Sequence, residues 1–455
     1  MKSEVKVFDR GNGEIQRAHV VSWDDWSQLD FLYLRQETAE QQKRALDCFY
    51  HIYHKFLVPT NPLIFPQMVM FALPDDVELP KEFESNKYGR VSDRLTVATI
   101  LLQEGVSLKK GKATFKTKQA ENLYQELEKR GFIHIVCGKM PNTKMIPIGR
   151  FAGYLSEVEE NAKIKANANF FIMDPFDCST SYDQVGTPFG LCVKDGEVLT
   201  PPCYNREALL VGAEGAPYIS QKDIFDLTIE IGGHKYIHGE NAIIYTRPNY
   251  AKTPNSNRVK VVIVGRKVVA VKESGSVPVP TSGYVLCLAN NSVGAEICPG
   301  DEVIYHGLED IKFGIQVGNS IVRDGVKTEE FISKFYNIYK LEPIPYPPSL
   351  YPMDFAGARA ARMAIGADAE GKPVMFWAEG KGKLEYVEGR DSTGASLTEM
   401  AEIAEALGLR NAVNLDGGGS AQILLENVRT LRISDRKTED NSDAERLVPL
   451  GLMVK

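Results

Sequence analysis

Short apolar runs separated by glycine-marked turns fill the chain after Gly131, and this pattern limits the possible folds more than any other feature. Residues 261–271 read VVIVGRKVVAV, two apolar runs around a Gly-Arg-Lys turn, which predicts a hairpin. Residues 315–325, IQVGNSIVRDG, have the same form and predict a second hairpin. Because such strands are grouped by hairpins rather than by regular helical crossovers, we expect an α+β fold with few helices. Its sheet should be mixed, largely antiparallel and twisted.

Helical patterns are prominent in the first 130 residues. Residues 39–57 place their apolar side chains on one helical stripe, and residues 118–130 form a second helical pattern that stops at Gly131. A chain of 455 residues is too long for one compact core. We therefore expect a helix-rich N-terminal region of unassigned role over residues 1–130 and a sheet domain over residues 131–455.

Charge, hydropathy and cysteine spacing exclude several classes of protein. The net charge of −7 argues against a protein that binds nucleic acid through phosphate contacts. No run is apolar enough to cross a membrane, and the opening MKSEVKVFDRGNGE lacks an apolar signal core, so a cytoplasmic, unexported chain is expected. Seven scattered cysteines without a C-x-x-C pair predict reduced thiols rather than a zinc site. The oligomeric state stays open.

The segment NLDGGGS, residues 414–420, concentrates glycines beside polar groups. No lysine follows the glycines and no helix-forming pattern comes after them, so a P-loop is excluded, and no βαβ unit supports a dinucleotide fingerprint. Asn414 and Asp416 alternate along a strand and should share one face at its end. The bare backbone of Gly417, Gly418 and Gly419, next to Ser420, would let a ligand approach closely. The alternative is a plain glycine-rich turn.

Two further segments carry charged groups suited to a site. Ser396 and Glu399 fit the capping box S-x-x-E at the start of the clearest C-terminal helix, 396–407, which explains Glu399 structurally but also leaves a catalytic role open. Arg359 and Arg362 precede an apolar strand, where a guanidinium suits carboxylate or phosphate recognition. An ordinary surface pair is the alternative, and it fits Arg359 better than Arg362.

The segment NANFF, residues 167–171, places two amides before two aromatic rings. Asn167 and Asn169 could hold sugar hydroxyls while Phe171 packs against a pyranose face. A buried strand with a polar edge explains the same residues equally well.

In this order, the segments resemble the phosphodiester glycosidase family from about residue 130 to the C-terminus. NANFF corresponds to the family's N-G-G-F-F, with Ala168 and Asn169 in place of the two glycines, and RMAIG from Arg362 corresponds to R-T-A-I-G. GASLTEMA places Glu399 at the family glutamate, NLDGGGS is intact, and ERLVPLGLMV corresponds to the closing E-R-x-V-x-N with Leu450 in place of asparagine.

The resemblance implies hydrolysis of a sugar-1-phosphodiester, with an N-acetylhexosamine-like sugar favoured. Asp416 and Glu399 would be the carboxylates beside the oxocarbenium-like transition state, and Arg362 would stabilise the phosphate leaving group. The substrate-binding residues would be Asn167, Asn169, Phe171, Asn414, Gly417, Gly418, Gly419, Ser420 and Arg359.

Two alternatives remain for this site. One is a glycosidase acting on glycans without phosphate, and the other is a non-catalytic carbohydrate-binding module of a larger assembly. In each case the partner is a carbohydrate or sugar phosphate. No cofactor is required, although carboxylate and amide oxygens near Asp416 would suit Ca²⁺.

Overall fold

A computed structural model describes the protein except residues 58–65, 137, 139, 159–161, 174–176, 203–205, 248–249, 290–295, 317, 319, 329–356, 382–390 and 438–439. Most of the described secondary structure is strand. Among the strand pairs of the described residues, only β4 (Pro66–Phe71) and β10 (Met140–Pro147) run parallel. The expectation of a largely antiparallel structure with few helices is therefore confirmed, although the fold is mostly β rather than an even mixture.

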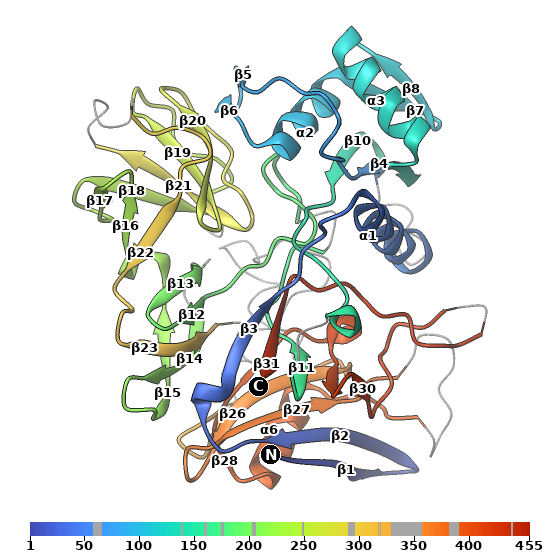
Figure 1. Ribbon diagram of the computed structural model, residues 1–455, viewed down its shortest axis with the longest axis vertical. Helices are drawn as coiled ribbons and strands as arrows, with labels where there is room; N and C mark the ends of the chain where they lie inside the picture. The colour runs from blue at the N-terminus through green and yellow to red at the C-terminus, as the bar shows by residue number, and fades with distance from the viewer. Residues whose placement is uncertain are drawn as a thin grey trace.

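A seven-stranded sheet forms the lower part of the molecule (Figure 1). Its strands, in spatial order, are β1 (Lys2–Gly11), β2 (Glu14–Ser22), β27 (Pro373–Ala378), β26 (Arg362–Asp368), β28 (Leu409–Asn414), β24 (Ser320–Arg323) and β25 (Val326–Lys327). Helix α6 (Leu397–Ala406) packs against one face through Met400, Ile403 and Ala404. The strand residues that alternate with those facing α6 point to the opposite face of the sheet, where they are buried in the main hydrophobic core.

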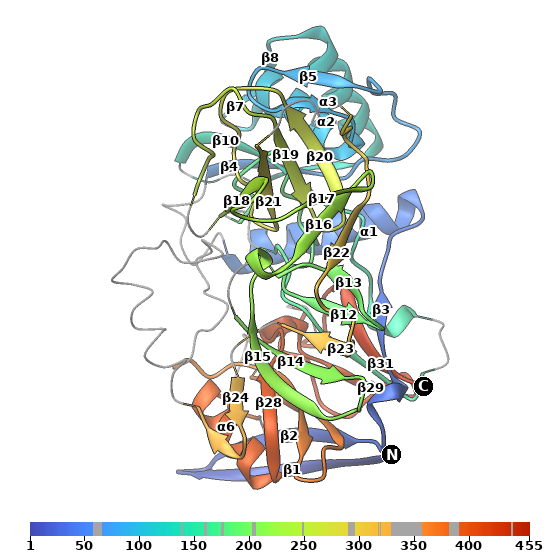
Figure 2. The same cartoon turned by 90° about the vertical axis from the view of Figure 1, so that its left-hand side faces the viewer.

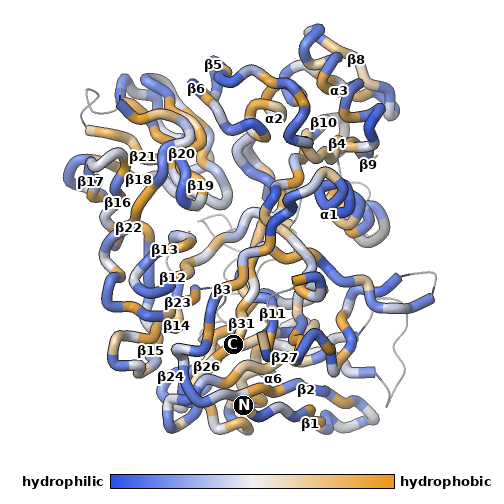
Figure 3. Tube along the Cα trace, in the orientation of Figure 1, coloured by the Kyte–Doolittle hydropathy of each residue, from blue (hydrophilic) through white to orange (hydrophobic). Residues whose placement is uncertain are grey.

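A five-stranded sheet lies against that opposite face. Its strands, in spatial order, are β3 (Leu29–Tyr33), β31 (Leu450–Val454), β11 (Ile164–Asn167), β29 (Ile423–Leu425) and β30 (Val428–Arg429). Figure 3 shows the resulting pattern: β31 is coloured hydrophobic, whereas the outermost strand β1 is largely hydrophilic.

The expectation of a helix-rich region over residues 1–130 is wrong. Strands β1 and β2 open the chain and pair with β27, and β3 pairs with β31, so this segment completes both C-terminal sheets. The helical stripe at residues 39–51 is present, but the alternating residues 2–22 form strands rather than part of a helical region. Strands from before and after residue 130 therefore lie in the same sheets, so the sheets are not divided at that residue.

Helices α1 (Ala39–His51), α2 (Arg94–Gly105) and α3 (Lys118–Arg130) gather at the upper right of Figure 1, with strands β4, β9 (Ile133–Val136) and β10. The buried stripe of α1 includes Leu46 and Phe49, and α3 stops at Gly131, whose φ of 77° is left-handed. Glycine adopts that conformation readily, which explains the helix end.

Most of the remaining strands form a β region along the left side of Figure 1, and Figure 2 shows it from its outer side. The hairpin expected at residues 261–271 is confirmed as β19 (Lys260–Val264) and β20 (Lys267–Lys272). The second expected hairpin is wrong, because β23 (Ile311–Ile315) joins a five-stranded sheet with β12 and β14, whereas β24 joins the seven-stranded sheet. Local alternation predicted both strands but not their partners.

The strands of this β region, by sheet, are β12 (Cys192–Lys194), β13 (Glu197–Thr200), β14 (Arg206–Gly212) and β15 (Pro217–Lys222) with β23; β16 (Thr228–Ile231), β17 (His234–Tyr236) and β22 (Val303–His306); and β18 (Ala242–Thr246), β21 (Gly283–Leu288), β5 (Phe83–Ser85) and β6 (Gly89–Val91) with β19 and β20. The two-stranded sheet is β7 (Val106–Lys109) and β8 (Lys112–Phe115).

Two further findings concern the helices and the cysteines. Within the described residues, no helix combines the length and apolarity that a bilayer span needs. The cysteines that can be described, Cys48, Cys178, Cys192, Cys287 and Cys298, are free thiols, as their spacing predicted.

Gly366 tests how closely β26 and β28 pack. A Cβ added there would lie 2.1 Å from the carbonyl oxygen of Asn411 and 2.8 Å from Cβ of Ala412. We expect Gly366→Ala to lower the free energy of unfolding by about 1–3 kcal/mol, because the neighbouring strand must move. Urea unfolding measures this. Gly212→Ala, on a strand with open space beside it, is the control and should differ little.

Candidate active site

The turn after β28 is fixed to both C-terminal sheets by backbone hydrogen bonds. Leu415 donates to the carbonyl of Met363 on β26 at 2.7 Å, and Gly418 donates to Ala361 at 2.7 Å. Asp416 donates to the carbonyl of Ala168, just after β11, at 3.1 Å. The turn therefore closes the junction between the seven-stranded and five-stranded sheets.

Two of the three glycines of the turn leave no space for a Cβ, and the third has a left-handed backbone. A Cβ on Gly417 would lie 2.7 Å from the carbonyl of Ala361, and one on Gly419 would lie 2.2 Å from Oδ2 of Asp435. Gly418 has a φ of +61° and faces open space. Protein atoms therefore fill the space beside the first and third glycines, and Gly418 is the position where a ligand could approach the bare backbone.

Asp416 is partly buried at this junction, and burial raises the pKa of its carboxyl to about 6. The hydroxyl of Ser420, the charges of Arg446 and Arg362, and the N–H of Gly417, which donates to Oδ1 at 2.9 Å, oppose that rise. A carboxylate with a pKa near neutrality can exchange a proton during a reaction.

Arg362 connects the turn to the start of α6. Its side chain is buried, and its Nε donates to the carbonyl of Ala395 at 3.2 Å, directly before the cap residue Ser396. The strand pleat places Arg362 and Asn414 on the face that α6 covers, because Ala364 and Ala412 on the same strands pack into the core beneath that helix. The structure thus brings together the three segments that the sequence singled out.

Arg446 and Asp435 were not assigned roles in the sequence analysis. Arg446 donates through Nε and Nη2 to Oδ2 of Asp435 at 3.0 and 2.7 Å, and both side chains are buried. Burial acts to lower the pKa of Arg446, but Asp435 and Asp416 outweigh it and raise that pKa, so the guanidinium stays charged. Arg446 lies in ERLVPLGLMV, one of the segments that resemble the family. Nothing in the sequence indicated that its guanidinium pairs with Asp435, so no role was predicted for it.

Glu399 is held by a guanidinium and a helix end. Arg359 donates to its carboxylate at 2.6, 2.9 and 3.1 Å, and the predicted capping box with Ser396 is present. Burial alone would raise the pKa of Glu399, but the hydrogen bonds from Arg359 and the Ser396 N–H outweigh it and lower the pKa. Arg359 also contacts Glu14 on β2 at 2.5 Å, so it lies at the surface between two glutamates.

The two amides of NANFF bind backbone groups. Asn167 donates to the carbonyl of Asp416 at 2.7 Å and accepts from Gln422 at 3.0 Å. Asn169 is buried and accepts from the thiol of Cys192 at 3.0 Å. Phe171 is buried as well. Asn167 therefore holds the Asp416 turn through its backbone, and Asn169 binds Cys192 at the start of β12.

Two buried polar groups of the turn lack a well-formed hydrogen bond to any described residue. They are the side-chain amide of Asn414, 1% exposed, and the hydroxyl of Ser420, which lies against Asp416 without good hydrogen-bond geometry. Buried polar atoms are normally satisfied, so these two are candidates for contacts with substrate or water. Among the described residues, no cluster of His, Cys, Asp or Glu is placed to hold a metal, and Ca²⁺ near Asp416 stays a prediction.

A perturbed carboxylate next to two arginines, at the junction of two sheets, is typical of an enzyme site. The model of the phosphodiester glycosidase family matches residues 238–455. These residues match the domain of a hydrolase family, and the resemblance is confirmed over them. The match includes Arg362, Glu399 and the NLDGGGS turn, whereas NANFF lies before it.

Curated relatives agree over a shorter segment. N-acetylglucosamine-1-phosphodiester alpha-N-acetylglucosaminidase of Mus musculus is 37% identical over 87 residues, and that of Homo sapiens is 38% identical over 87 residues. The matched segment spans 19% of this chain and 15% of each relative.

Two solved structures are similar to this chain at low sequence identity. A hypothetical protein from Synechocystis is 15% identical, with a TM-score of 0.43 over 99% of this chain and 61% of that one. The catalytic domain of zebrafish N-acetylglucosamine-1-phosphodiester alpha-N-acetylglucosaminidase, auto-inhibited by its pro-peptide, is 16% identical. Its TM-score is 0.26 over 64% of this chain and 94% of that one.

The raised pKa of Asp416 predicts a pH-dependent stability difference. The folded protein binds this proton more tightly than the unfolded chain, so the stabilisation from protonated Asp416 is present at low pH and is lost as the pH rises through about 6. We expect Asp416→Asn to be more stable than the native protein at pH 7.5, by at most about 3 kcal/mol, with the difference shrinking towards pH 4.5. Urea unfolding at both pH values measures it.

The exposed Asp24 provides the control, since Asp24→Asn should show no such trend. A difference between Asp416→Asn and the native protein that stays constant with pH would contradict the buried, raised-pKa carboxyl.

Proposed function

We propose that this protein hydrolyses a sugar-1-phosphodiester, with an N-acetylhexosamine-like sugar favoured. The observation that carries this proposal is the position of Asp416, within the electrostatic influence of Arg362 and Arg446 on a turn fixed between two sheets. The match of residues 238–455 to the phosphodiester glycosidase family supports the same reaction class.

The leaving group explains why cationic residues matter in this reaction. A phosphate ester that departs from a sugar C1 is already a weak base, so strong help from a general acid is less important. Positive charge near its oxygens stabilises the transition state instead, and we assign this role to Arg362. Its contact with Ala395 fixes the guanidinium between the turn and α6, so little reorganisation is needed during reaction.

Asp416 is the carboxylate that we assign to the oxocarbenium-like transition state, as nucleophile or as base for water. Glu399 is less suited to that step, because Arg359 and the α6 N-terminus hold its pKa low and occupy its oxygens. We assign Glu399 to positioning: it fixes the Ser396 cap of α6, directly after the Ala395 carbonyl that holds Arg362. Asn414 and Ser420 would bind sugar hydroxyls, and Gly418 would admit the substrate next to the backbone.

A panel of sugar-1-phosphodiesters and aryl glycosides of the same sugars tests the reaction class. With product detection by NMR, we expect turnover of the phosphodiester and a decrease in kcat of about 10²–10⁴-fold in Asp416→Asn, since the carboxylate is lost while the fold is kept. Equal turnover of both substrate types would favour a glycosidase on glycans without phosphate. Binding of intact ligand without any product would favour a carbohydrate-binding module.

Arg362→Lys separates leaving-group stabilisation from sugar binding. Lysine keeps the charge but loses the planar fork. We expect kcat/KM for the phosphodiester to fall by about 10–10³-fold, with a smaller decrease for an aryl glycoside of the same sugar. Arg359→Lys is the matched control, because Arg359 lies at the surface, and it should affect both substrates alike. Equal losses in Arg362→Lys for the two substrates would contradict the assignment.

A further inference from the structure

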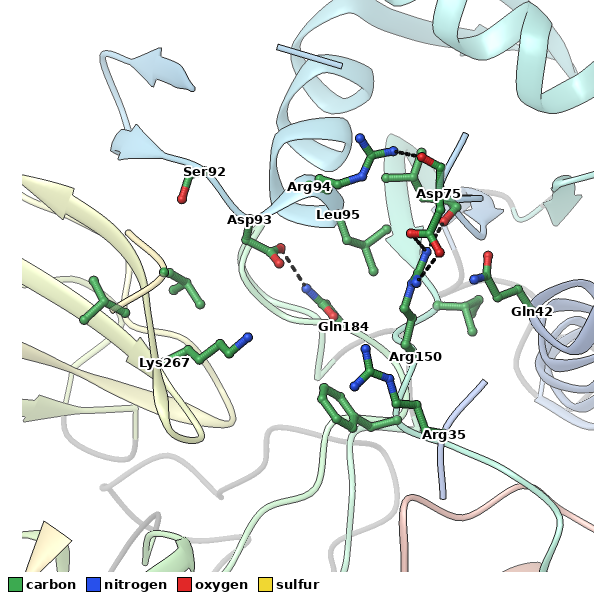
Figure 4. A pocket seen from close by; sticks show the side chains of 16 residues that line it. Arg35, Gln42, Asp75, Ser92, Asp93, Arg94, Leu95, Arg150, Gln184 and Lys267 are labelled. Atoms are coloured by element: carbon green, nitrogen blue, oxygen red, sulfur yellow. Dashed lines mark hydrogen bonds and ion pairs between the residues drawn. The ribbon is translucent and has the colours of Figure 1, made fainter. Parts of the chain in front are cut away.

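A cavity of about 420 Å³ lies where α1, the start of α2 and the first residues of β20 meet (Figure 4). Its volume falls within the range of small-molecule sites. None of residues 414–420 lines it. The charged side chains in its walls are Arg35, Arg94, Arg150, Lys267, Asp75 and Asp93. Positive charge is therefore in excess.

The two carboxylates of the wall are already engaged by protein groups. Asp75 accepts from Nη1 and Nη2 of Arg150 at 2.8 and 2.5 Å. Those hydrogen bonds, with the charges of Arg94 and Arg35, hold the pKa of Asp75 below its usual range. Asp93 caps α2 and accepts from the N–H and hydroxyl of Thr96 at 2.8 and 2.6 Å. The hydrogen bonds of Asp93 come from neutral groups, so its negative charge remains, but the four cations of the wall still outnumber its two carboxylates.

Arg94 keeps its positive charge although its guanidinium is held. Its Nη2 donates to the backbone carbonyls of Asp75 and Val77 at 3.1 and 2.6 Å, which are neutral acceptors. These contacts fix the guanidinium beside the cavity without cancelling its charge.

Lys267 and Arg35 face the cavity from opposite sides, with Gln184 between them (Figure 4). In the described part of the chain, no carboxylate lies within ion-pair distance of Lys267. Arg35 has one weak ion pair, 3.5 Å from Glu37, whose side chain is 70% exposed. Exposed pairs of this kind contribute little. The cavity thus presents two side chains whose charge the protein does not satisfy.

An aromatic ring lines the same cavity. Phe151 is 48% exposed, and the Arg35 guanidinium lies 5.7 Å from its ring centroid. An exposed ring of this size offers a flat apolar surface, on which the face of a pyranose ring can pack. Cations and an aromatic ring together suit a ligand that is both a sugar and an anion.

We propose that this cavity binds an anionic saccharide unit, with its phosphate or carboxylate between Lys267 and Arg35 and its ring against Phe151. The site is separate from the Asp416 turn, so it goes beyond the proposed hydrolysis and does not depend on turnover.

Isothermal titration calorimetry on the full chain tests this proposal. The probes are glucose 6-phosphate, glucuronate, inorganic phosphate and methyl glucoside. We expect one or both anionic sugars to bind, inorganic phosphate to bind more weakly, and methyl glucoside not to bind. The two anionic sugars distinguish a phosphate ligand from a carboxylate ligand. Lys267→Ala and Arg35→Ala should each raise the Kd by about tenfold or more, because a charge-assisted contact is lost.

Lys235→Ala, which removes an exposed lysine on β17, is the matched control and should leave the Kd unchanged. The proposal is overturned if no anionic sugar binds, if methyl glucoside binds equally well, or if the Kd is the same in both cavity variants and the native protein. Because no turnover is measured, a chain without hydrolase activity would give the same result.

Discussion

The backbone of residues 415–418 joins the two C-terminal sheets, and the candidate site depends on that connection. Leu415 and Gly418 donate to carbonyls on one side of the junction, and Asp416 donates to Ala168 on the other. These bonds fix the direction of the Asp416 carboxyl without using the carboxyl itself. Asn167 strengthens the arrangement from β11, because its amide holds the carbonyl of Asp416. A reactive carboxyl on a rigid backbone can be positioned more accurately than one on a long side chain in an open loop.

Local sequence patterns predicted the pieces of this site but not what each piece contacts. The capping box at Ser396 and the alternation of Asn414 and Asp416 depend on neighbours in the chain, and the structure contains both. The contacts of Gly419 with Asp435 and of Arg362 with Ala395 join segments distant in sequence. The periodicity of a sequence gives no information about such contacts between distant segments. For that reason the glycines suggested room for a ligand, whereas protein atoms fill the space beside two of them.

For the fold as well, sequence patterns predicted local elements but not the long-range pairing between strands. Hairpin turns identify adjacent strands such as β19 and β20, and these were read correctly. Pairing between β2 and β27 closes a loop of more than three hundred residues, and nothing within either strand specifies its partner. The N-terminal hairpin was therefore missed, although its strands complete the sheet that carries Arg362. The same long-range pairing places Glu14 beside Arg359 and couples the first residues to the start of α6.

Charge balance around Asp416 favours an anionic ligand when that carboxyl is protonated. Arg362 and Arg446 supply two positive charges, and Asp435 supplies one negative charge. An ionised Asp416 makes this set neutral, whereas a protonated Asp416 leaves one positive charge in excess. A phosphodiester monoanion would therefore bind best to the protonated form and would raise the pKa of Asp416 further, since like charges disfavour ionisation. The proposed role of Asp416 as nucleophile or base needs the ionised form, so binding of the anionic ligand and the reactive state of Asp416 oppose each other, and the charges of the two arginines determine the balance between them.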